Sequence, residues 1–140
     1  MIKKFNNFLS DNVCNMLIGF FESSDKKEKF RDTIVLNYRN NKILKRLHNL
    51  FNINLLLTPI HMQIVKWPQN SFMKEHYDSG DQYGVLLYLN DNFKGGETII
   101  DGQTIKPKKG SGVLFTNGKL LHSVCKVKEG TRYVLPIWYK

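Results

Sequence analysis

The sequence predicts a mainly β protein whose helices are confined to the N-terminal third. From about residue 55 onward, apolar and polar residues alternate with a period of two, as in strands that have one buried face. Turn signals rich in Gly, Asn and Asp interrupt this part of the chain, so we expect about eight short strands there. Closely spaced strands with such turns favour a barrel or a jelly roll, with the helices covering one outer face.

The chain begins with a segment that we expect to be helical, residues 1–21. Its apolar side chains recur every three or four positions, which is the spacing of an amphipathic helix. A second helix can begin within this segment at Ser10 or Asp11, because either side chain can accept from a free N–H of the first turn. The apolar positions are Phe5, Phe8, Leu9, Val13, Cys14, Leu17, Ile18 and Phe21.

A strand and a third helix complete the N-terminal third. Residues 22–29 are charged and predict a solvated connection, and the β-branched side chains of residues 33–38 predict a strand. Residues 40–51 predict the third helix, which Asn52 and Asn54 end. Its apolar face comprises Ile43, Leu44, Leu47, Leu50 and Phe51.

The remaining strands lie in the period-two part of the chain. Turns are expected at Ser79 to Asp81, Asn117-Gly118 and Glu129-Gly130, a loop at residues 94–96, and a hairpin at Asp101-Gly102. The strands are expected at residues 61–67, 72–78, 83–90, 97–100, 103–106, 110–116, 122–127 and 131–139.

The composition fits one globular domain. The chain has 140 residues, of which 41% are hydrophobic, and this is enough for a core. We expect a single domain in which residues 1–54 form a helical support region and residues 55–140 the β core. The only two cysteines, Cys14 and Cys125, are interpreted as reduced and mostly buried thiols, with a disulfide between them as the alternative.

Hydropathy and charge bear on location and partners. No segment has the roughly 18 apolar residues of a membrane span, and no cleavage site follows the first lysines, so we expect a cytoplasmic or otherwise intracellular protein without a signal peptide. The formal net charge of +9 indicates solubility, an acidic partner or nucleic acid. The basic residues lie in small scattered groups without an arginine-rich stripe, which argues against nucleic acid as the main substrate.

The most informative motif is His76-Tyr77-Asp78, followed downstream by His122 and Arg132. Residues two apart on a strand project from the same face, so one ion can bridge the first histidine and the aspartate. Two imidazoles and one carboxylate can occupy one face of an iron(II) ion and leave positions open for a cosubstrate and O2. Arg132 could hold the far end of a dicarboxylic cosubstrate.

Two other interpretations of this motif remain open at this point. The same ligand set suits catalytic zinc, although the helical His-Glu-x-x-His spacing is absent. Alternatively, His76 and Asp78 form a half-buried hydrogen bond and His122 is not involved. The two remaining histidines are interpreted as ordinary surface or core residues.

Ordered blocks along nearly the whole chain are similar to those of a known family. The blocks are Phe8-Leu9-Ser10 with Cys14, Trp67-Pro68 with His76-Tyr77-Asp78, Tyr88-Leu89-Asn90 with residues 93–98, residues 107–115 with Leu121-His122-Ser123-Val124, and residues 130–133 with Trp138. Together they resemble the iron(II)- and 2-oxoglutarate-dependent dioxygenases of the prolyl 4-hydroxylase type.

The resemblance implies a fold and an activity. The fold is a double-stranded β-helix, that is, a jelly-roll, cupin-like core flanked by about three helices, with iron(II) in its mouth. The ligands would be His76, Asp78 and His122. The activity is a hydroxylation that consumes O2 and 2-oxoglutarate and releases succinate and CO2, with ascorbate as an accessory cofactor.

The resemblance also implies positions for cosubstrate and substrate. Arg132 would pair with the distal carboxylate of 2-oxoglutarate, and Tyr88 matches the position whose hydroxyl joins that arginine. Trp67 stands where many relatives have a tyrosine, so a polar contact to the cosubstrate is expected to be lost. By the period-two rule, Arg132 shares a strand face with Trp138, and this face should line the pocket. Trp138 and Tyr83 are candidate substrate residues, because an aromatic face suits a pyrrolidine ring, with a plain core role as the alternative for Trp138.

Hydroxylation of a prolyl residue in a peptide or protein is the leading hypothesis. The same chemistry could instead act on a lysyl residue, a free amino acid or another small molecule. Nucleic-acid demethylation is disfavoured, because relatives with that activity carry a second arginine where this chain has Trp138. A non-catalytic binding module is disfavoured by the complete set of site residues.

Overall fold

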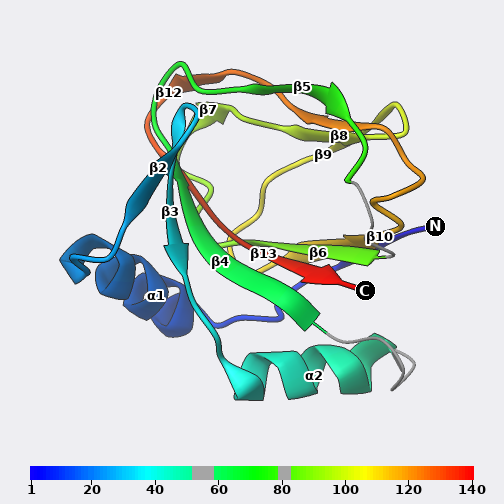
Figure 1. Cartoon of the computed structure of the whole chain (residues 1–140), viewed down its shortest axis with the longest axis horizontal. Coiled ribbons are helices and arrows are strands. Elements are labelled where there is room, and N and C mark those ends of the chain that lie inside the picture. Colours follow the sequence, from blue (N-terminus) through cyan, green and yellow to red (C-terminus); the bar gives the residue numbers. More distant parts are fainter. Residues whose placement is uncertain (52–58, 79–82) are drawn as a thin grey trace.

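The chain forms two facing antiparallel β-sheets, with two helices on the outer side of the larger sheet (Figure 1). This computed structural model describes residues 1–51, 59–78 and 83–140. The helices are α1 (Asp11–Ser23) and α2 (Asn41–Phe51). The strands are β1 (Ile2–Phe5), β2 (Glu28–Phe30), β3 (Thr33–Asn37), β4 (Pro59–Trp67), β5 (Met73–His76), β6 (Tyr83–Tyr88), β7 (Lys94–Gly95), β8 (Thr98–Ile100), β9 (Gln103–Ile105), β10 (Gly112–Phe115), β11 (His122–Val124), β12 (Val127–Glu129) and β13 (Arg132–Tyr139).

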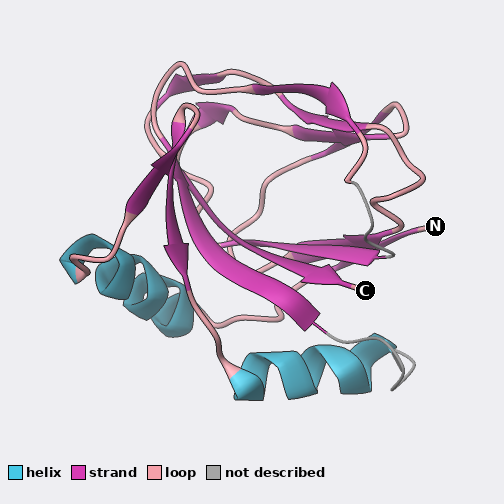
Figure 2. Cartoon of the chain, viewed as in Figure 1, coloured by secondary structure: helices cyan, strands magenta, loops and turns pink. Residues whose placement is uncertain are grey.

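The strand order defines a jelly roll. The larger sheet has the order β1-β10-β6-β13-β4-β3-β2, and the smaller sheet has the order β5-β11-β8-β9. The core strands pair in a nested way: β4 with β13, β5 with β11, β6 with β10, and β8 with β9. The expected mainly β fold with a double-stranded β-helix core is therefore confirmed (Figure 2).

The first residues differ from the expected helix. Residues 2–5 form the edge strand β1, which pairs with β10. Phe8 and Leu9 follow in a loop, where both backbone N–H groups donate to the carbonyl of Gly110 at 2.9 and 3.0 Å. A helix formed by these first residues would be short and only marginally stable on its own. The hydrogen bonds to β10 and to Gly110 satisfy the backbone groups of this segment instead. The described residues therefore contain two helices, and residues 1–51 add strands to the larger sheet as well as helical support.

Helix α1 begins where the sequence predicted. Ser10 is the N-cap, and its hydroxyl accepts from the N–H of Val13 at 3.2 Å. The predicted apolar spacing corresponds to a face that packs on the larger sheet. The fully buried residues of this face are Cys14, Leu17 and Phe21.

Helix α2 packs on the same side of the larger sheet. The side chain of Asn40 accepts from the N–H of Ile43 at 3.1 Å and begins the helix. Leu50 was expected on the apolar face but is 53% exposed. At about 100° of turn per residue, Leu50 lies at the margin of the stripe that Ile43, Leu44 and Leu47 bury. Asn52 and Asn54, expected to end this helix, lie outside the described residues.

Several short connections also differ from expectation. The solvated connection expected at residues 22–29 is interrupted at its end, where residues 28–30 form the edge strand β2. All three side chains of this strand are exposed, so no apolar alternation indicated it. Residues 94–95, expected in a loop, form β7 and pair with β12.

The Asp101-Gly102 hairpin is confirmed, with φ of 49° and 76°. The turn expected at Ser79 to Asp81 lies outside the described residues.

The larger sheet separates two apolar clusters, one toward the helices and one toward the smaller sheet. Strand β13 contributes to both because its side chains alternate. Arg132, Val134 and Trp138 lie on the inner face, as the period-two rule predicted, while Leu135 and Ile137 face the helices. The inner face of β13 therefore carries polar side chains into the space between the sheets.

Both cysteines are free thiols, and no disulfide joins them. Cys14 is fully buried, as expected, and Cys125 is half-buried. None of the helices in the described ranges has both the length and the apolar character that crossing a membrane demands.

Candidate active site

Two histidines meet across the smaller sheet. His76 ends β5 and His122 begins β11, and the two residues are directly opposed in the strand pairing. Their ring centroids lie 4.3 Å apart. Asp78 follows beyond the end of β5, where its backbone N–H donates to the carbonyl of Asn117 at 3.1 Å. One ligand atom from each of these two histidines and Asp78 lies within 4.8 Å of the others.

Backbone carbonyls fix the orientation of both imidazoles. The Nδ1–H of His76 donates to the carbonyl of Lys74 at 2.7 Å, and the Nδ1–H of His122 donates to that of Leu120 at 2.9 Å. With Nδ1 protonated, the lone pair of a neutral ring lies on Nε2. Both Nε2 atoms are 3.4 Å from Oδ1 of Asp78, so the three atoms face a common point.

The other carboxylate oxygen of Asp78 is held by two donors. The side-chain amide of Asn117 donates to Oδ2 at 3.0 Å, and the indole Nε1–H of Trp138 donates to it at 3.1 Å. Burial opposes ionisation of Asp78, but His122 and these two donors outweigh it and lower the pKa of the carboxyl. Burial likewise opposes protonation of His122, and its hydrogen bond to Asp78 outweighs this and raises the pKa of the imidazole.

The donor set fits a divalent transition metal. Two neutral imidazole nitrogens and one carboxylate oxygen converge, each with its second polar atom already bonded elsewhere, as is usual for metal ligands. Iron(II) and catalytic zinc both accept this set. Arg132, which lines the same cavity, bears on the choice between iron(II) and zinc.

Arg132 is buried, with 1% of its surface exposed. Its Nη2 donates to Oγ1 of Thr98 at 2.9 Å, and that hydroxyl is hydrogen-bonded to the hydroxyl of Tyr88 at 2.7 Å. Its guanidinium carbon lies 4.9 Å from the ring centroid of Trp67. Among the described residues, neither Nε nor Nη1 has a hydrogen-bond partner, and no carboxylate pairs with this cation. Burial lowers the pKa of Arg132, and a bound anion would compensate the buried charge.

One cavity of about 680 Å³ is lined by the three candidate metal ligands and by Arg132. Trp138 and Trp67 line it, and the hydroxyl of Tyr88 reaches its wall through Thr98. Tyr83 does not reach it. This residue lies on the other face of β6 and packs against the cluster beneath the helices. The structure thus brings together all the sequence-predicted site residues except Tyr83.

Two residues of the site were not assigned a role from the sequence. Asn117 was visible only as part of the Asn117-Gly118 turn signal, and Thr98 only as the end of a family-like block. Asn117 orients Asp78, and Thr98 links Arg132 to the tyrosine hydroxyl. Neither side chain is chemically distinctive, so only the fold reveals its position.

Comparison with known proteins connects this site to one family. A family model described as the 2OG-Fe(II) oxygenase superfamily matches residues 62–140. Human prolyl 3-hydroxylase 2 is 40% identical over 65 residues, which cover 41% of this chain and 9% of that protein. Prolyl 4-hydroxylase 1 of Arabidopsis thaliana is 25% identical over 113 residues, which cover 56% of this chain and 40% of that protein. The chain therefore spans less than half of either relative.

Solved structures share the fold. The viral collagen prolyl hydroxylase of Paramecium bursaria Chlorella virus-1, in its 2OG complex, has a TM-score of 0.76 at 20% identity and covers 99% of this chain and 94% of that one. A Pseudomonas putida prolyl-4-hydroxylase has a TM-score of 0.78 at 18% identity, covering 99% and 91%. A Trichoplax adhaerens prolyl hydroxylase in complex with a hypoxia inducible factor peptide has a TM-score of 0.76 at 18% identity, covering 99% and 82%. At these identities the likeness establishes the jelly-roll fold.

Proposed function

We propose, because this chain belongs to the 2OG-Fe(II) oxygenase superfamily, that it is an iron(II)- and 2-oxoglutarate-dependent dioxygenase that hydroxylates prolyl residues in a peptide or protein, of the prolyl 4-hydroxylase type. The proposal rests on one observation: a set of converging metal-ligand atoms and a buried arginine line the same cavity. Three ligand atoms converge within 4.8 Å, and the same cavity holds a buried arginine with two unpartnered nitrogens. A redox metal would bind the three ligand atoms, and a dicarboxylate cosubstrate on that metal would pair with the arginine.

His76 and His122 would hold iron(II) through Nε2, and Asp78 would hold it through Oδ1. When bound, iron with 2-oxoglutarate supplies O2 activation and the oxidising power for hydroxylating a C–H bond. The contribution of the chain is orientation. The carbonyls that accept from Nδ1 fix the two rings, and the donors Asn117 and Trp138 fix the carboxylate.

Arg132 would bind the distal carboxylate of 2-oxoglutarate through the nitrogens that have no partner. A charge-assisted pair at a site that is 1% exposed is strong and directional, so it would fix the cosubstrate and exclude water. Thr98 holds the guanidinium from one side and Trp67 from its face. The Nε1–H of Trp67 is buried and has no partner in the part of the chain that the structure describes, so it would offer a donor in place of the tyrosine of many relatives.

The prolyl substrate is proposed from the relatives and from the cavity wall. The curated relatives carry the name prolyl hydroxylase, and one structural neighbour is a complex with a peptide. The rings of Trp138 and His61 stand edge to face, with centroids 6.3 Å apart, and both line the cavity on the side of Asp78. Such a wall suits a saturated pyrrolidine ring.

The test is incubation of the protein with Fe(II), 2-oxoglutarate, O2, ascorbate and a panel of proline-containing peptides. We expect peptides to gain one oxygen atom by mass spectrometry, with one succinate formed per oxygen transferred. Amino-acid analysis of the product then separates 4-hydroxyproline from 3-hydroxyproline. The His76→Ala variant should lose both products, and the exposed α2 variant Lys45→Ala should keep them.

Absence of oxygen transfer to any peptide of a broad panel would overturn the prolyl assignment. Succinate formation that is stimulated by lysyl peptides or by small molecules would transfer the proposal to those substrates. Unchanged turnover in His76→Ala would count against the whole site.

A further inference from the structure

We propose that the tip of the β2–β3 hairpin, formed by Phe30 and Arg31, selects peptide substrates that carry an acidic residue near the target proline. The inference rests on the proposed function, because it names a class of substrate for the same cavity.

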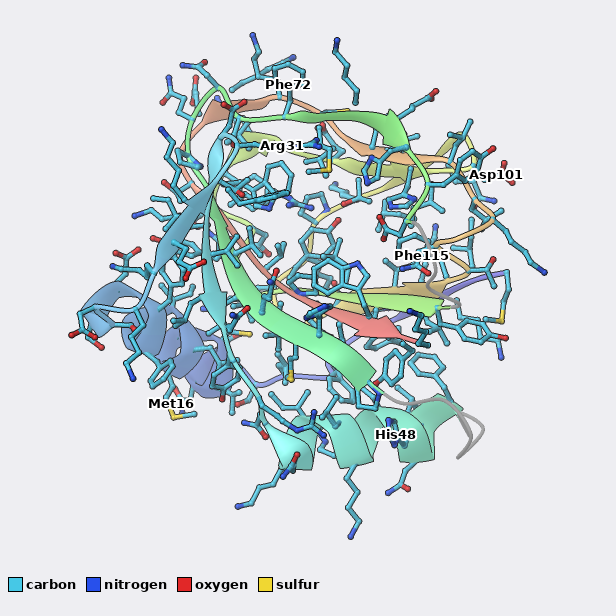
Figure 3. All side chains as sticks on the ribbon, viewed as in Figure 1. Met16, Arg31, His48, Phe72, Asp101 and Phe115 are labelled. Carbon is cyan, nitrogen blue, oxygen red and sulfur yellow. The ribbon has the colours of Figure 1, made fainter. Side chains whose placement is uncertain are left out.

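The hairpin forms part of the cavity that contains the metal-binding residues. Strand β2 ends the larger sheet, and the turn Arg31-Asp32 joins it to β3, with Phe30 opposite Thr33. Figure 3 shows Arg31 at the end of this hairpin. Phe30 and Arg31 line the same cavity as His76 and Asp78. A ligand that extends out of the site along β3 therefore meets the hairpin tip.

Arg31 has an unfavourable backbone conformation. Its φ is 54°, in the left-handed region that is costly for a residue with a Cβ atom. The other non-glycine residues with positive φ in the described ranges are Asn7, Asn70 and Asp101, which are of the types that tolerate this region. An arginine here lowers the stability of the turn, and a role for its side chain accounts for its presence.

The neighbouring aromatic ring adds nothing to the core. Phe30 is 55% exposed, although it lies beside a large cavity. The guanidinium carbon of Arg31 lies 5.5 Å from the centroid of this ring, so the two side chains form one surface. An apolar ring next to a cation fits a peptide that presents an apolar and an acidic side chain close together.

The part of the cavity wall next to this hairpin carries more positive than negative side chains. The charged side chains of residues 26–31 that line the cavity are the cations Lys26, which precedes β2, Lys29 and Arg31, and one anion, Glu28. Lys29 also lines a second cavity on the other side of the hairpin, so Lys26 and Arg31 provide most of the charge toward the substrate. In the ranges the structure describes, neither of these two cations forms an ion pair. Their charge is available to an acidic residue of a substrate.

Matched peptides test the inference. Glu, Gln or Lys is placed in turn at each position within three residues of the target proline, and kcat/KM is measured from hydroxylated product. We expect wild-type protein to prefer Glu over Lys by about fivefold at its best position, as for one solvent-exposed ion pair, and to lose this preference at high salt. Arg31→Glu should reverse the order. The matched control Lys45→Glu, on the exposed face of α2, should keep the wild-type order.

The variant Arg31→Gly separates recognition from turn stability. Glycine adopts φ of 54° without the Cβ penalty, so we expect Tm to stay constant or rise while the preference for Glu is lost. A preference that survives in both Arg31→Gly and Arg31→Glu overturns the inference.

Fluorescence anisotropy of labelled peptides, recorded without turnover, distinguishes the two proposals. If acidic peptides bind, lose affinity in Arg31→Glu and are never hydroxylated, recognition by Arg31 stands and prolyl hydroxylation fails. If peptides are hydroxylated with no preference for charge, prolyl hydroxylation stands and recognition by Arg31 fails.

Discussion

The indole Nε1–H of Trp138 donates to Oδ2 of Asp78 at 3.1 Å and thereby links the last strand of the jelly roll to the three candidate metal ligands. Asn117 donates to the same oxygen at 3.0 Å. These two bonds leave Oδ1, which faces both imidazoles, as the oxygen available to a metal. Trp138, expected from the sequence as a substrate residue or plain core, is thus placed to support the carboxylate.

Replacing Trp138 by Phe should weaken metal binding while keeping an aromatic ring in the wall. Loss of one donor to a ligating carboxylate typically reduces metal affinity about tenfold or more, and we expect a reduction of this size. Titration calorimetry with Mn(II) in the absence of cosubstrate measures it directly. Trp67→Phe is the control, since Trp67 contacts Arg132 and is expected to keep the wild-type metal affinity. Equal Mn(II) affinities for Trp138→Phe and wild type would refute this role.

Gly84 provides the space that Asn117 occupies. A Cβ atom at this position would lie 3.0 Å from Nδ2 and 3.2 Å from Cγ of Asn117. Gly84→Ala should therefore displace the amide from Asp78 and lower metal affinity in the same calorimetric experiment. Gly19→Ala is the matched control, because apart from the adjacent residues and the backbone of α1 itself, no described heavy atom lies within 4 Å of its Cβ position. It should raise the free energy of unfolding by about 0.5–1 kcal/mol and leave metal affinity unchanged.

The convergence of His76, Asp78 and His122 could be predicted because their side-chain chemistry is visible in the sequence. The sequence contains a rare combination: a histidine and an aspartate two positions apart, a distant histidine, and an arginine on an apolar strand. The geometric reason was only partly right. Asp78 lies beyond the end of β5, and its orientation comes from Asn117 and Trp138 as well as from strand alternation.

The parts that could not be predicted depend on long-range pairing. Asn117 is close to Asp78 because β11 pairs with β5 and so brings the two loops together, and no local pattern records this. Residues 2–5 read equally well as a helix stripe, and only the free edge of β10 selects a strand. Residues 28–30 are wholly exposed and therefore carry no hydrophobic period.

Glu22 connects α1 to the larger sheet and should make stability depend on pH. The hydroxyl of Tyr133 donates to its Oε1, and Nζ of Lys66 donates to the same oxygen at 3.0 Å. The hydrogen bond from Tyr133, with that from Lys66, lowers the pKa of Glu22 below its ordinary 4.5. The stabilisation is therefore complete above about pH 4.5 and is lost as the pH falls through the folded-state pKa.

Urea unfolding between neutral and acidic pH measures this dependence. Wild-type protein should lose more free energy of unfolding on acidification than Glu22→Gln. Because the Glu22 side chain is 40% exposed, the difference should stay below about 1 kcal/mol. Parallel pH profiles for the two proteins would contradict the prediction.

Arg132 should contribute to cosubstrate binding and little to folding. Its buried guanidinium has two nitrogens without partners, so the folded chain bears a desolvation cost that no protein carboxylate in the described ranges offsets. Arg132→Met fills a similar volume without the charge, and we expect its free energy of unfolding without cosubstrate to equal or exceed that of wild type. Addition of 2-oxoglutarate should raise the Tm of wild-type protein, because the ligand binds only the folded state.

The same addition should leave the Tm of Arg132→Met unchanged, since a distal carboxylate would then enter a buried site without a cation. Loss of one partner of a buried ion pair costs about 3–5 kcal/mol, which corresponds to at least a hundredfold loss of affinity. Arg132→Lys keeps the charge but loses the planar donor set that Thr98 and the ring of Trp67 position, so its Tm shift should be intermediate. Differential scanning fluorimetry across a 2-oxoglutarate series measures all three proteins. A wild-type shift in Arg132→Met would show that the carboxylate binds elsewhere in the cavity.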